Sequence, residues 1–118
     1  AAQQGYTAFG IEPNSREAGY ALKNGVNVIG STIDNLSDGK EIFNVITLWD
    51  VLEHIQQPVD YLSALRPLLS RHGLVFVQVP TSDSLAARIL RENCNMFDGI
   101  EHLTLFSRGS LYIAFQKA

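Results

Sequence analysis

The hydrophobic positions along the chain fall into short continuous runs that alternate with residues at helical spacing. The runs are rich in β-forming residues and predict strands at residues 6–11, 26–29, 43–49 and 74–79. Apolar residues three or four positions apart predict helices near 15–24, 59–70, 85–90 and 110–117. Short strands that alternate with amphipathic helices predict an α/β fold with a mostly parallel sheet.

The ends of the predicted elements carry specific signals. Asn14 is followed by Glu17 three positions later, which is a helix-capping pattern, and Gly25 is suited to close the same helix. Ser82 or Asp83 is expected to cap the helix at 85–90. Gly73 is expected to end the helix at 59–70.

Composition narrows the class of protein. With 118 residues, the chain is long enough for one domain, and a hydrophobic fraction of 46% argues against disorder. The net charge of −3 argues against a nucleic-acid partner, which requires a basic surface. The sole cysteine, Cys94, fits a reducing cytoplasm. No apolar run reaches the ~20 residues of a membrane span, so we expect a cytoplasmic chain without a membrane partner.

Ligands of open parallel sheets bind outside the carboxyl ends of the strands, and polar residues follow each predicted strand here. Glu12 follows the first one. Its two carboxylate oxygens could accept both hydroxyls of a ribose, and the simpler alternative is a solvated or helix-capping carboxylate.

The segment after the third strand is the richest in candidate chemistry. Asp50, Glu53 and His54 have i, i+3, i+4 spacing, so a helical turn would place them on one face. Such a cluster could bind a divalent metal, orient a substrate or transfer a proton. The alternatives are that Asp50 caps the following helix and that His54 bonds to the backbone. Glu101 and His102 form a second acidic–histidine pair, in an irregular stretch of a kind that often covers a substrate.

Several familiar signatures are absent from the sequence. It contains no glycine-rich phosphate-binding motif, no nucleophile elbow, and no cysteine–histidine spacing typical of zinc. We therefore assign no metal site from the sequence, and whether Glu53 and His54 bind a metal stays open.

Four segments resemble, in order and spacing, the class I S-adenosylmethionine-dependent methyltransferases. They are GIEPN at 10–14, FNVITLWDVLEHI at 43–55, LRPLLSRHGLVFVQVP at 65–80 and EHLTLFSRGSL at 101–111. The similar branch is the type 11/12/23 small-molecule group, with its ubiquinone-pathway-like and sugar-modifying O-methyltransferases. The resemblance implies a Rossmann-like fold, S-adenosylmethionine as cofactor and a small-molecule methyl acceptor.

The resemblance also implies site residues, which lie after three of the strands. The implied cofactor-binding residues are Glu12 at the ribose, Pro13 and Asn14 beside the adenosine, Thr32 and Ile33 at the adenine, and Leu48, Trp49 and Asp50 beside the methionine part. The implied catalytic residues are His54 or His102 as the base, with Asp50 and Glu53 as orienting groups. Some ubiquinone-pathway-like members use the acidic–histidine pair as metal ligands.

The sequence departs from the family in one respect. Such enzymes begin with a strand and an Asp-x-Gly-x-Gly turn, and relatives continue into two further strands, none of which is found in these 118 residues. We therefore expect a single partial domain over 1–118, with about four parallel strands, lacking the first and the last two strands of the family sheet. Unpaired strand edges favour self-association, so a homo-oligomer is expected.

Three functional interpretations remain. The first is a methyltransferase core acting on a small molecule, with the 118 residues inactive by themselves. The second is a non-catalytic methyltransferase-like remnant that serves as an oligomerisation or interaction module. The third and weakest is a nicotinamide-dependent dehydrogenase, a class that also places an acidic residue after its second strand.

Overall fold

A computed structural model describes residues 4–36, 42–91, 94 and 102–118. The chain divides into two compact units, residues 1–41 and 42–118, and each is described by itself. The single domain expected over 1–118 stays a prediction.

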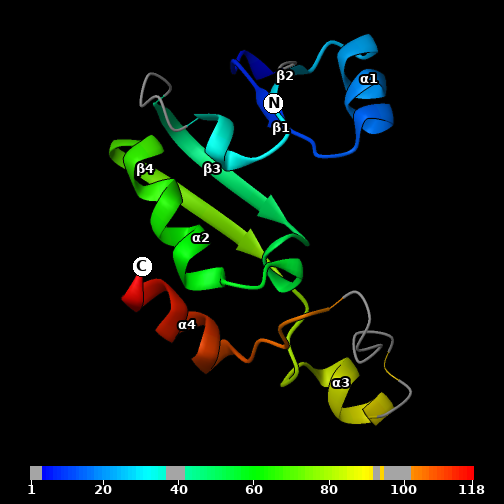
Figure 1. Ribbon diagram of the computed structural model, residues 1–118. Helices are drawn as coiled ribbons and strands as arrows, with labels where there is room; N and C mark the ends of the chain where they lie inside the picture. The colour runs from blue at the N-terminus through cyan, green and yellow to red at the C-terminus, as the bar shows by residue number, and fades with distance from the viewer. Residues whose placement is uncertain (1–3, 37–41, 92–93, 95–101) are drawn as a thin grey trace. The chain divides into compact units, whose positions relative to one another are not determined.

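The first unit contains two parallel strands joined by a helix (Figure 1). Strand β1 spans Phe9–Ile11, helix α1 spans Ser15–Lys23, and strand β2 spans Asn27–Gly30. A 3₁₀ turn, η2, follows at Ile33–Leu36. Because the strands are parallel, their carboxyl ends lie at the same edge, as the sequence predicted for a ligand-binding edge.

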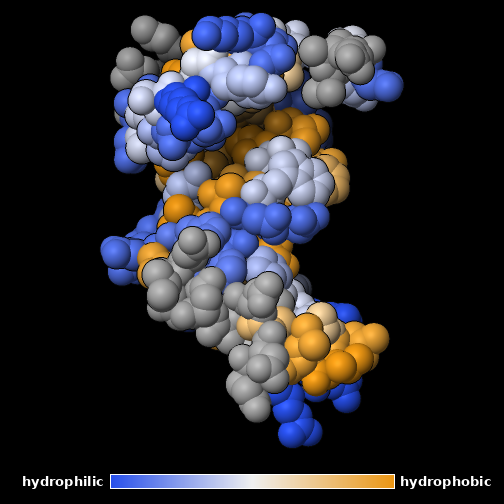
Figure 2. All heavy atoms as spheres, turned by 90° about the vertical axis from the view of Figure 1, so that its right-hand side faces the viewer, coloured by the Kyte–Doolittle hydropathy of each residue, from blue (hydrophilic) through white to orange (hydrophobic). Residues whose placement is uncertain are grey.

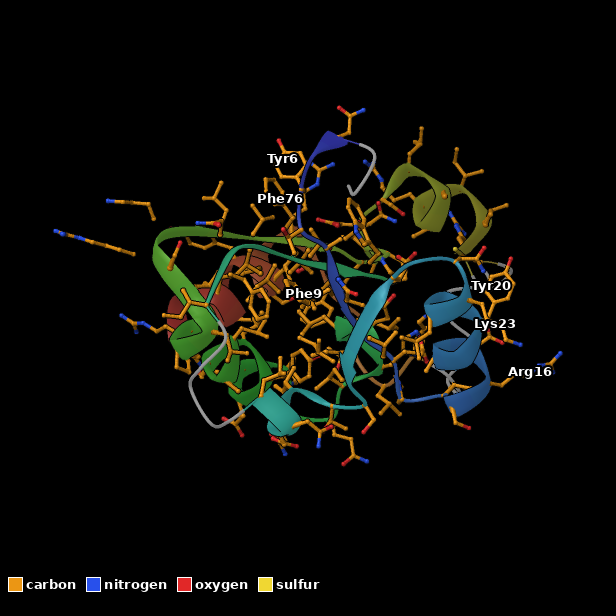
Figure 3. The ribbon with its side chains drawn as sticks, turned by 90° about the horizontal axis from the view of Figure 1, so that it is seen from above. Tyr6, Phe9, Arg16, Tyr20, Lys23 and Phe76 are labelled. Atoms are coloured by element: carbon orange, nitrogen blue, oxygen red, sulfur yellow. The ribbon has the colours of Figure 1, made fainter. Side chains whose placement is uncertain are left out.

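Both ends of α1 follow local sequence signals. The Asn14 side chain accepts hydrogen bonds from the backbone N–H groups of Arg16 and Glu17. At the other end Gly25 has φ +79°, and the Gly25 and Val26 N–H groups donate to the carbonyls of Leu22 and Ala21. This is a Schellman motif, so the predicted glycine stop is confirmed. The side chains of Arg16, Tyr20 and Lys23 project from α1 (Figure 3).

The second unit contains a parallel strand pair and the remaining helices (Figure 1). Strand β3 spans Phe43–Trp49 and strand β4 spans Leu69–Gln78. Between them lie the 3₁₀ turn η3 at Leu52–His54, helix α2 at Pro58–Leu65 and the 3₁₀ turn η4 at Arg66–Leu68. Helices α3 at Leu85–Leu90 and α4 at Arg108–Lys117 follow β4.

The boundary between α2 and β4 differs from the prediction. The helix ends at Leu65, not near residue 70, and Pro67 lies in a short 3₁₀ turn before β4 begins at Leu69. The β3–β4 register shifts between the pairs Phe43–Leu69 and Val45–Leu74. Gly73 lies at this irregularity, where an added Cβ would be 2.9 Å from Leu69 Cδ2 and 3.1 Å from the Phe43 carbonyl oxygen. The glycine therefore permits a close backbone approach instead of ending a helix.

The caps of the last two helices also differ from the predicted ones. Ser84, not Ser82 or Asp83, caps α3 by accepting from the Ala87 N–H. Asp83 Oδ2 instead accepts from the Arg108 N–H at the start of α4. Helix α4 begins two residues earlier than predicted, with Ser107 and Ser110 forming a reciprocal capping box.

The buried residues of the second unit come from β3, η3, α2, η4 and the two last helices, and from the chain between those helices. Helices α2 and α4 contact each other (Figure 1). On α3 the side chains of Leu85, Ile89 and Leu90 are exposed, and an apolar patch lies near the lower end of Figure 2. The described residues of this unit that are buried and apolar are Leu48, Leu52, Leu62, Leu65, Leu68, Ala87, Cys94, Phe106 and Ala114.

The predicted α/β class with parallel strands is confirmed. Both strand pairs are parallel, and helices follow or connect the strands in each unit. Among the described residues, no helix combines the length and apolar character needed to cross a membrane.

We expect truncation of the α2 core to destabilise the second unit. Leu65 is 2% exposed and Leu85 is 71% exposed. Leu65→Ala should lower the free energy of unfolding by about 2–4 kcal/mol, because it removes packed methyl groups and leaves a cavity. The control Leu85→Ala should change it by less than about 0.5 kcal/mol. Denaturant unfolding followed by fluorescence of Trp49, the chain's sole tryptophan, measures both. Equal losses in the two variants would contradict the assigned core.

Candidate functional site

In the first unit, Glu12 lies at the carboxyl edge of the β1–β2 pair. Its backbone N–H donates to the Gly30 carbonyl at the end of β2, with an N···O distance of 3.1 Å. This bond places Glu12 beside the segment that follows β2, in which Thr32 is exposed and Ile33 is partly buried. The predicted ribose residue and the two predicted adenine residues therefore share one edge of the first unit.

The Glu12 carboxylate is partly engaged by its own loop. Oε1 accepts from the Asn14 N–H at 2.9 Å, while Asn14 itself caps α1. Pro13 and Asn14 are exposed. A ribose that used both carboxylate oxygens would have to replace the Asn14 N–H, whereas a single hydrogen bond to Oε2 would not. Asn14 caps α1 as predicted, whereas Glu12 accepts from the N-cap residue and not from an N–H of the helix. Ribose binding by Glu12 stays a prediction.

Asn35 organises the loop after β2 and was not singled out from the sequence. Its Oδ1 accepts from the backbone N–H groups of Ser31 and Thr32, both at 3.0 Å, and from the Ser31 hydroxyl at 3.0 Å. One amide oxygen therefore fixes the two residues that precede Ile33. The sequence offers only a general signal, because asparagine is common in turns, and it does not reveal these bonds to residues three and four positions earlier.

In the second unit, β3 ends with Leu48 and Trp49, and Asp50 follows it directly. Leu48 is buried and Trp49 is 61% exposed. Asp50 has φ +50°, its N–H donates to the Gln78 carbonyl at 3.0 Å, and both its carboxylate oxygens lie 3.4 Å from Gln78 Nε2. Asp50 is therefore tied to the end of β4.

The helical turn that would have joined Asp50 to Glu53 and His54 is not formed. Only Leu52–His54 adopt a 3₁₀ turn, and the left-handed backbone at Asp50 separates this residue from the turn. The i, i+3, i+4 argument was therefore wrong about Asp50. Glu53 and His54 do lie together, in a turn of different geometry.

Glu53 is the one charged residue among the described residues that is buried, at 1% exposure. Neither of its carboxylate oxygens has a hydrogen-bond partner within the described part of the chain. An ionised carboxylate removed from water without a compensating group costs several kcal/mol, so the arrangement calls for a partner of positive or hydrogen-bonding character.

His102 joins Glu53 and His54 from a distant part of the sequence. The His54 and His102 rings are stacked, with centroids 5.1 Å apart and planes inclined by 24°. Glu53, His54 and His102 each offer a ligand atom, and these atoms all lie within 4.8 Å of one another. His54 is exposed and His102 half-buried. Glu101, the other half of the second predicted pair, lies outside the described residues.

Backbone hydrogen bonds hold the segment that carries His102. The Thr104 N–H donates to the Glu53 carbonyl at 3.0 Å. Two residues on, Phe106 forms a parallel bridge with Thr81, and its carbonyl accepts from the Ser82 N–H at 2.7 Å. The segment at 102–106 thus lies against η3 at one point and against the residues after β4 at another.

The cluster of Glu53, His54 and His102 is equipped for two kinds of chemistry. Imidazole exchanges a proton readily near neutral pH, so either ring can act as a general base beside a bound acceptor. Two imidazoles and a carboxylate are also a donor set that binds divalent transition metals.

Parallel strands with polar residues at their carboxyl ends define a class of α/β proteins that bind ligands at that edge. Within that class, the family model described as "Methyltransferase domain" matches residues 1–118. The chain therefore belongs to this family of class I S-adenosylmethionine-dependent methyltransferase-type domains, as the resemblance indicated. No curated protein and no solved structure matches the chain.

We expect Asn35 to be required for order in the loop after β2. In Asn35→Ala the amides of Ser31 and Thr32 lose their acceptor, and their hydrogen exchange should accelerate by about fivefold, since a hydrogen bond contributes about 1 kcal/mol. Asn35→Asp keeps the acceptor oxygen and should retain most of the protection. Exchange measured by NMR tests this, and unchanged protection in the alanine variant would contradict it.

Proposed function

We propose that the chain acts in methyl transfer from S-adenosylmethionine to a small-molecule oxygen, nitrogen or carbon. The observation that carries the proposal is the family match over all 118 residues, joined to Glu12 at the carboxyl edge of β1 and β2. The seven-stranded family sheet, of which these residues would form a part, belongs to the same proposal.

In the first unit, the proposal assigns the nucleoside half of the cofactor to the edge formed by Glu12 and the loop after β2. Glu12 Oε2 makes no hydrogen bond with a described residue and is available to accept from a ribose hydroxyl. Thr32 and Ile33, held by Asn35, would border the adenine. A carboxylate acceptor beside a short polar loop fits a nucleoside, which offers hydroxyl donors and a flat apolar ring.

In the second unit, the proposal assigns the methyl acceptor to the cluster of Glu53, His54 and His102. Bound S-adenosylmethionine would supply the methyl group, which passes to the acceptor as the sulfur departs and leaves S-adenosylhomocysteine. The protein contributes proximity and orientation, and the acceptor's proton is lost at the cluster. The residues assigned to the methionine part of the cofactor are Trp49, exposed at the end of β3, and Asp50, which follows it.

The proposal predicts that S-adenosylhomocysteine perturbs the NMR amide signals of Glu12, Ser31 and Thr32 when it is titrated into the 118-residue chain. We expect weak binding, above the micromolar range, because the glycine-rich turn of the family is not among these residues. Glu12→Gln should weaken the response, since a neutral amide accepts less strongly than a carboxylate. The control Glu17→Gln changes an exposed carboxylate of α1 and should not.

NAD serves as the contrasting ligand in the same titration. A dehydrogenase would bind NAD more tightly than S-adenosylhomocysteine through the same acidic residue. A response to NAD alone, or no response to S-adenosylhomocysteine at Glu12, would overturn the assignment of the cofactor.

A second candidate function is self-association, and the exposed apolar face of the β3–β4 pair favours it. Val45 pairs with Leu74 and Thr47 pairs with Phe76, and the three apolar residues are 50–56% exposed. Each sheet has two strands within the described residues, so each strand has one edge without a strand partner there. Two-stranded sheets are marginal alone and recruit further strands or apolar cover. We propose a second copy of the chain as that cover.

Self-association predicts an average mass in light scattering that rises with protein concentration. Phe76→Lys should shift the average toward the monomer, because it places a charge on the apolar face. Tyr112→Lys changes a residue of α4 that is 64% exposed and should leave the mass unchanged. A monomer at all concentrations in the unsubstituted chain would refute the proposal.

A further inference from the structure

We infer that Glu53, His54 and His102 together form a binding site for a divalent transition-metal cation, of which Zn²⁺ and Co²⁺ are the probes. The inference deepens the proposed function, because it concerns the cluster to which the acceptor was assigned. It rests on that function only for the chemical role of the ion, and not for the binding of the ion itself.

The donor set selects the kind of cation. Imidazole nitrogens suit Zn²⁺, Co²⁺ and Ni²⁺, and one carboxylate with two imidazoles leaves coordination positions open for water or a substrate. Mg²⁺ and Ca²⁺ prefer oxygen donors alone. A site with two histidines and one carboxylate therefore discriminates against these abundant hard cations.

The spacing of the donors is close to what one ion requires. Two ligands that each lie about 2.1 Å from a shared ion are at most about 4.2 Å apart. The three ligand atoms here lie within 4.8 Å of one another, so they need to draw together by roughly half an ångström. His54 is exposed, and a change of its side-chain rotamer would bring its ring nitrogen closer to the other two donors and open the stack of the two rings.

The burial of Glu53 is an independent observation that points to a cation. This carboxylate is 1% exposed, and neither oxygen has a hydrogen-bond partner within the described residues. A charge in such a place is destabilising unless something of opposite charge compensates it. A cation held between Glu53 and the two histidines would do so.

The backbone holds His102, and not Asp50, at this site. The hydrogen bond from Thr104 N–H to the Glu53 carbonyl brings the chain that carries His102 to η3. Asp50, which sequence spacing had grouped with Glu53 and His54, instead directs its carboxylate to Gln78 Nε2. The ligand set of this chain therefore contains a residue from beyond α3 in place of one that is near in sequence.

When a cation is bound, the histidines act as its ligands and do not take the acceptor's proton. A hydroxyl acceptor that coordinated the ion would release its proton to water more easily, because the positive charge would stabilise the resulting anion. The bound ion thereby replaces an imidazole as the group that favours loss of the acceptor's proton.

The test is titration of the 118-residue chain with Zn²⁺ by calorimetry and with Co²⁺ by visible absorption. We expect one ion per chain and Co²⁺ bands of a low-coordinate site with nitrogen and oxygen donors. His54→Ala, His102→Ala and Glu53→Gln should each weaken binding by about tenfold or more, since each removes a ligand. Circular dichroism of each variant shows whether it is folded.

Two control variants sharpen the test. His72→Ala removes the third histidine of the chain, which is exposed on β4, and should leave affinity unchanged. Asp50→Asn should also bind normally. If His72→Ala lost as much metal affinity as His102→Ala, the ion would be bound by surface histidines without a defined site, and the inference would be overturned. A loss in Asp50→Asn with none in His102→Ala would overturn the ligand set.

If a variant fails to fold, NMR of the unsubstituted chain still tests which histidines bind the ion. Paramagnetic Co²⁺ should broaden or shift the ring signals of His54 and His102 well before those of His72, and equal effects on all three would contradict the site. Titration with S-adenosylhomocysteine, with and without Zn²⁺, separates the two proposals. Metal binding without cofactor binding sustains the inference and overturns the proposed function. Cofactor binding without metal binding overturns the inference and sustains the proposed function.

Discussion

The backbone hydrogen bond from the Thr104 N–H to the Glu53 carbonyl joins the two parts of the chain that form the candidate site of the second unit. Glu53 and His54 are placed by a turn after β3, whereas His102 comes from beyond α3. The stacking of the His54 and His102 rings is a second contact between these two parts. The bridge between Phe106 and Thr81 holds the same segment against the residues that follow β4. His102 is therefore positioned by backbone contacts on its C-terminal side, and a site supported in this way is better ordered than one on an unsupported loop.

The elements that sequence reasoning predicted well are those whose cause is local. The run Phe43–Trp49 forms β3 with the predicted bounds, because β-branched and aromatic residues favour a strand, although four of its seven residues are exposed. The end of α1 follows from Gly25, since glycine adopts the left-handed backbone there without a steric penalty. The edge shared by Glu12 and Thr32 follows from parallel strand pairing, a regularity of α/β folds.

The incorrect predictions had two causes, which are ambiguous local signals at the α2–β4 boundary and contacts between residues distant in sequence at the candidate site. Leucine spacing extended α2 into residues that form β4, because Leu68 and Leu69 suit a helix and a strand equally and Pro67 was not weighed. Asp50 was grouped with Glu53 by assuming a helical turn, but pairing of its N–H with the Gln78 carbonyl holds it in a left-handed conformation. Neither the Asp50–Gln78 contact nor the meeting of His54 with His102 has a sequence period that would reveal it.

Burial of Glu53 is hard to explain by stability alone. Leu52, its neighbour in the same turn, is 0% exposed and fills its position with apolar atoms, as a core residue should. A carboxylate in the next position loses its hydration and gains no hydrogen bond from the described residues. Replacing buried charges by apolar residues of similar size is often neutral or stabilising, so packing does not require a charge here. What distinguishes this position from its neighbour is its distance to two imidazoles, which can compensate the charge by donating a proton or by sharing a cation. The proposed reactive or ion-binding role would explain why a carboxylate is kept at this position despite the energetic cost of its burial.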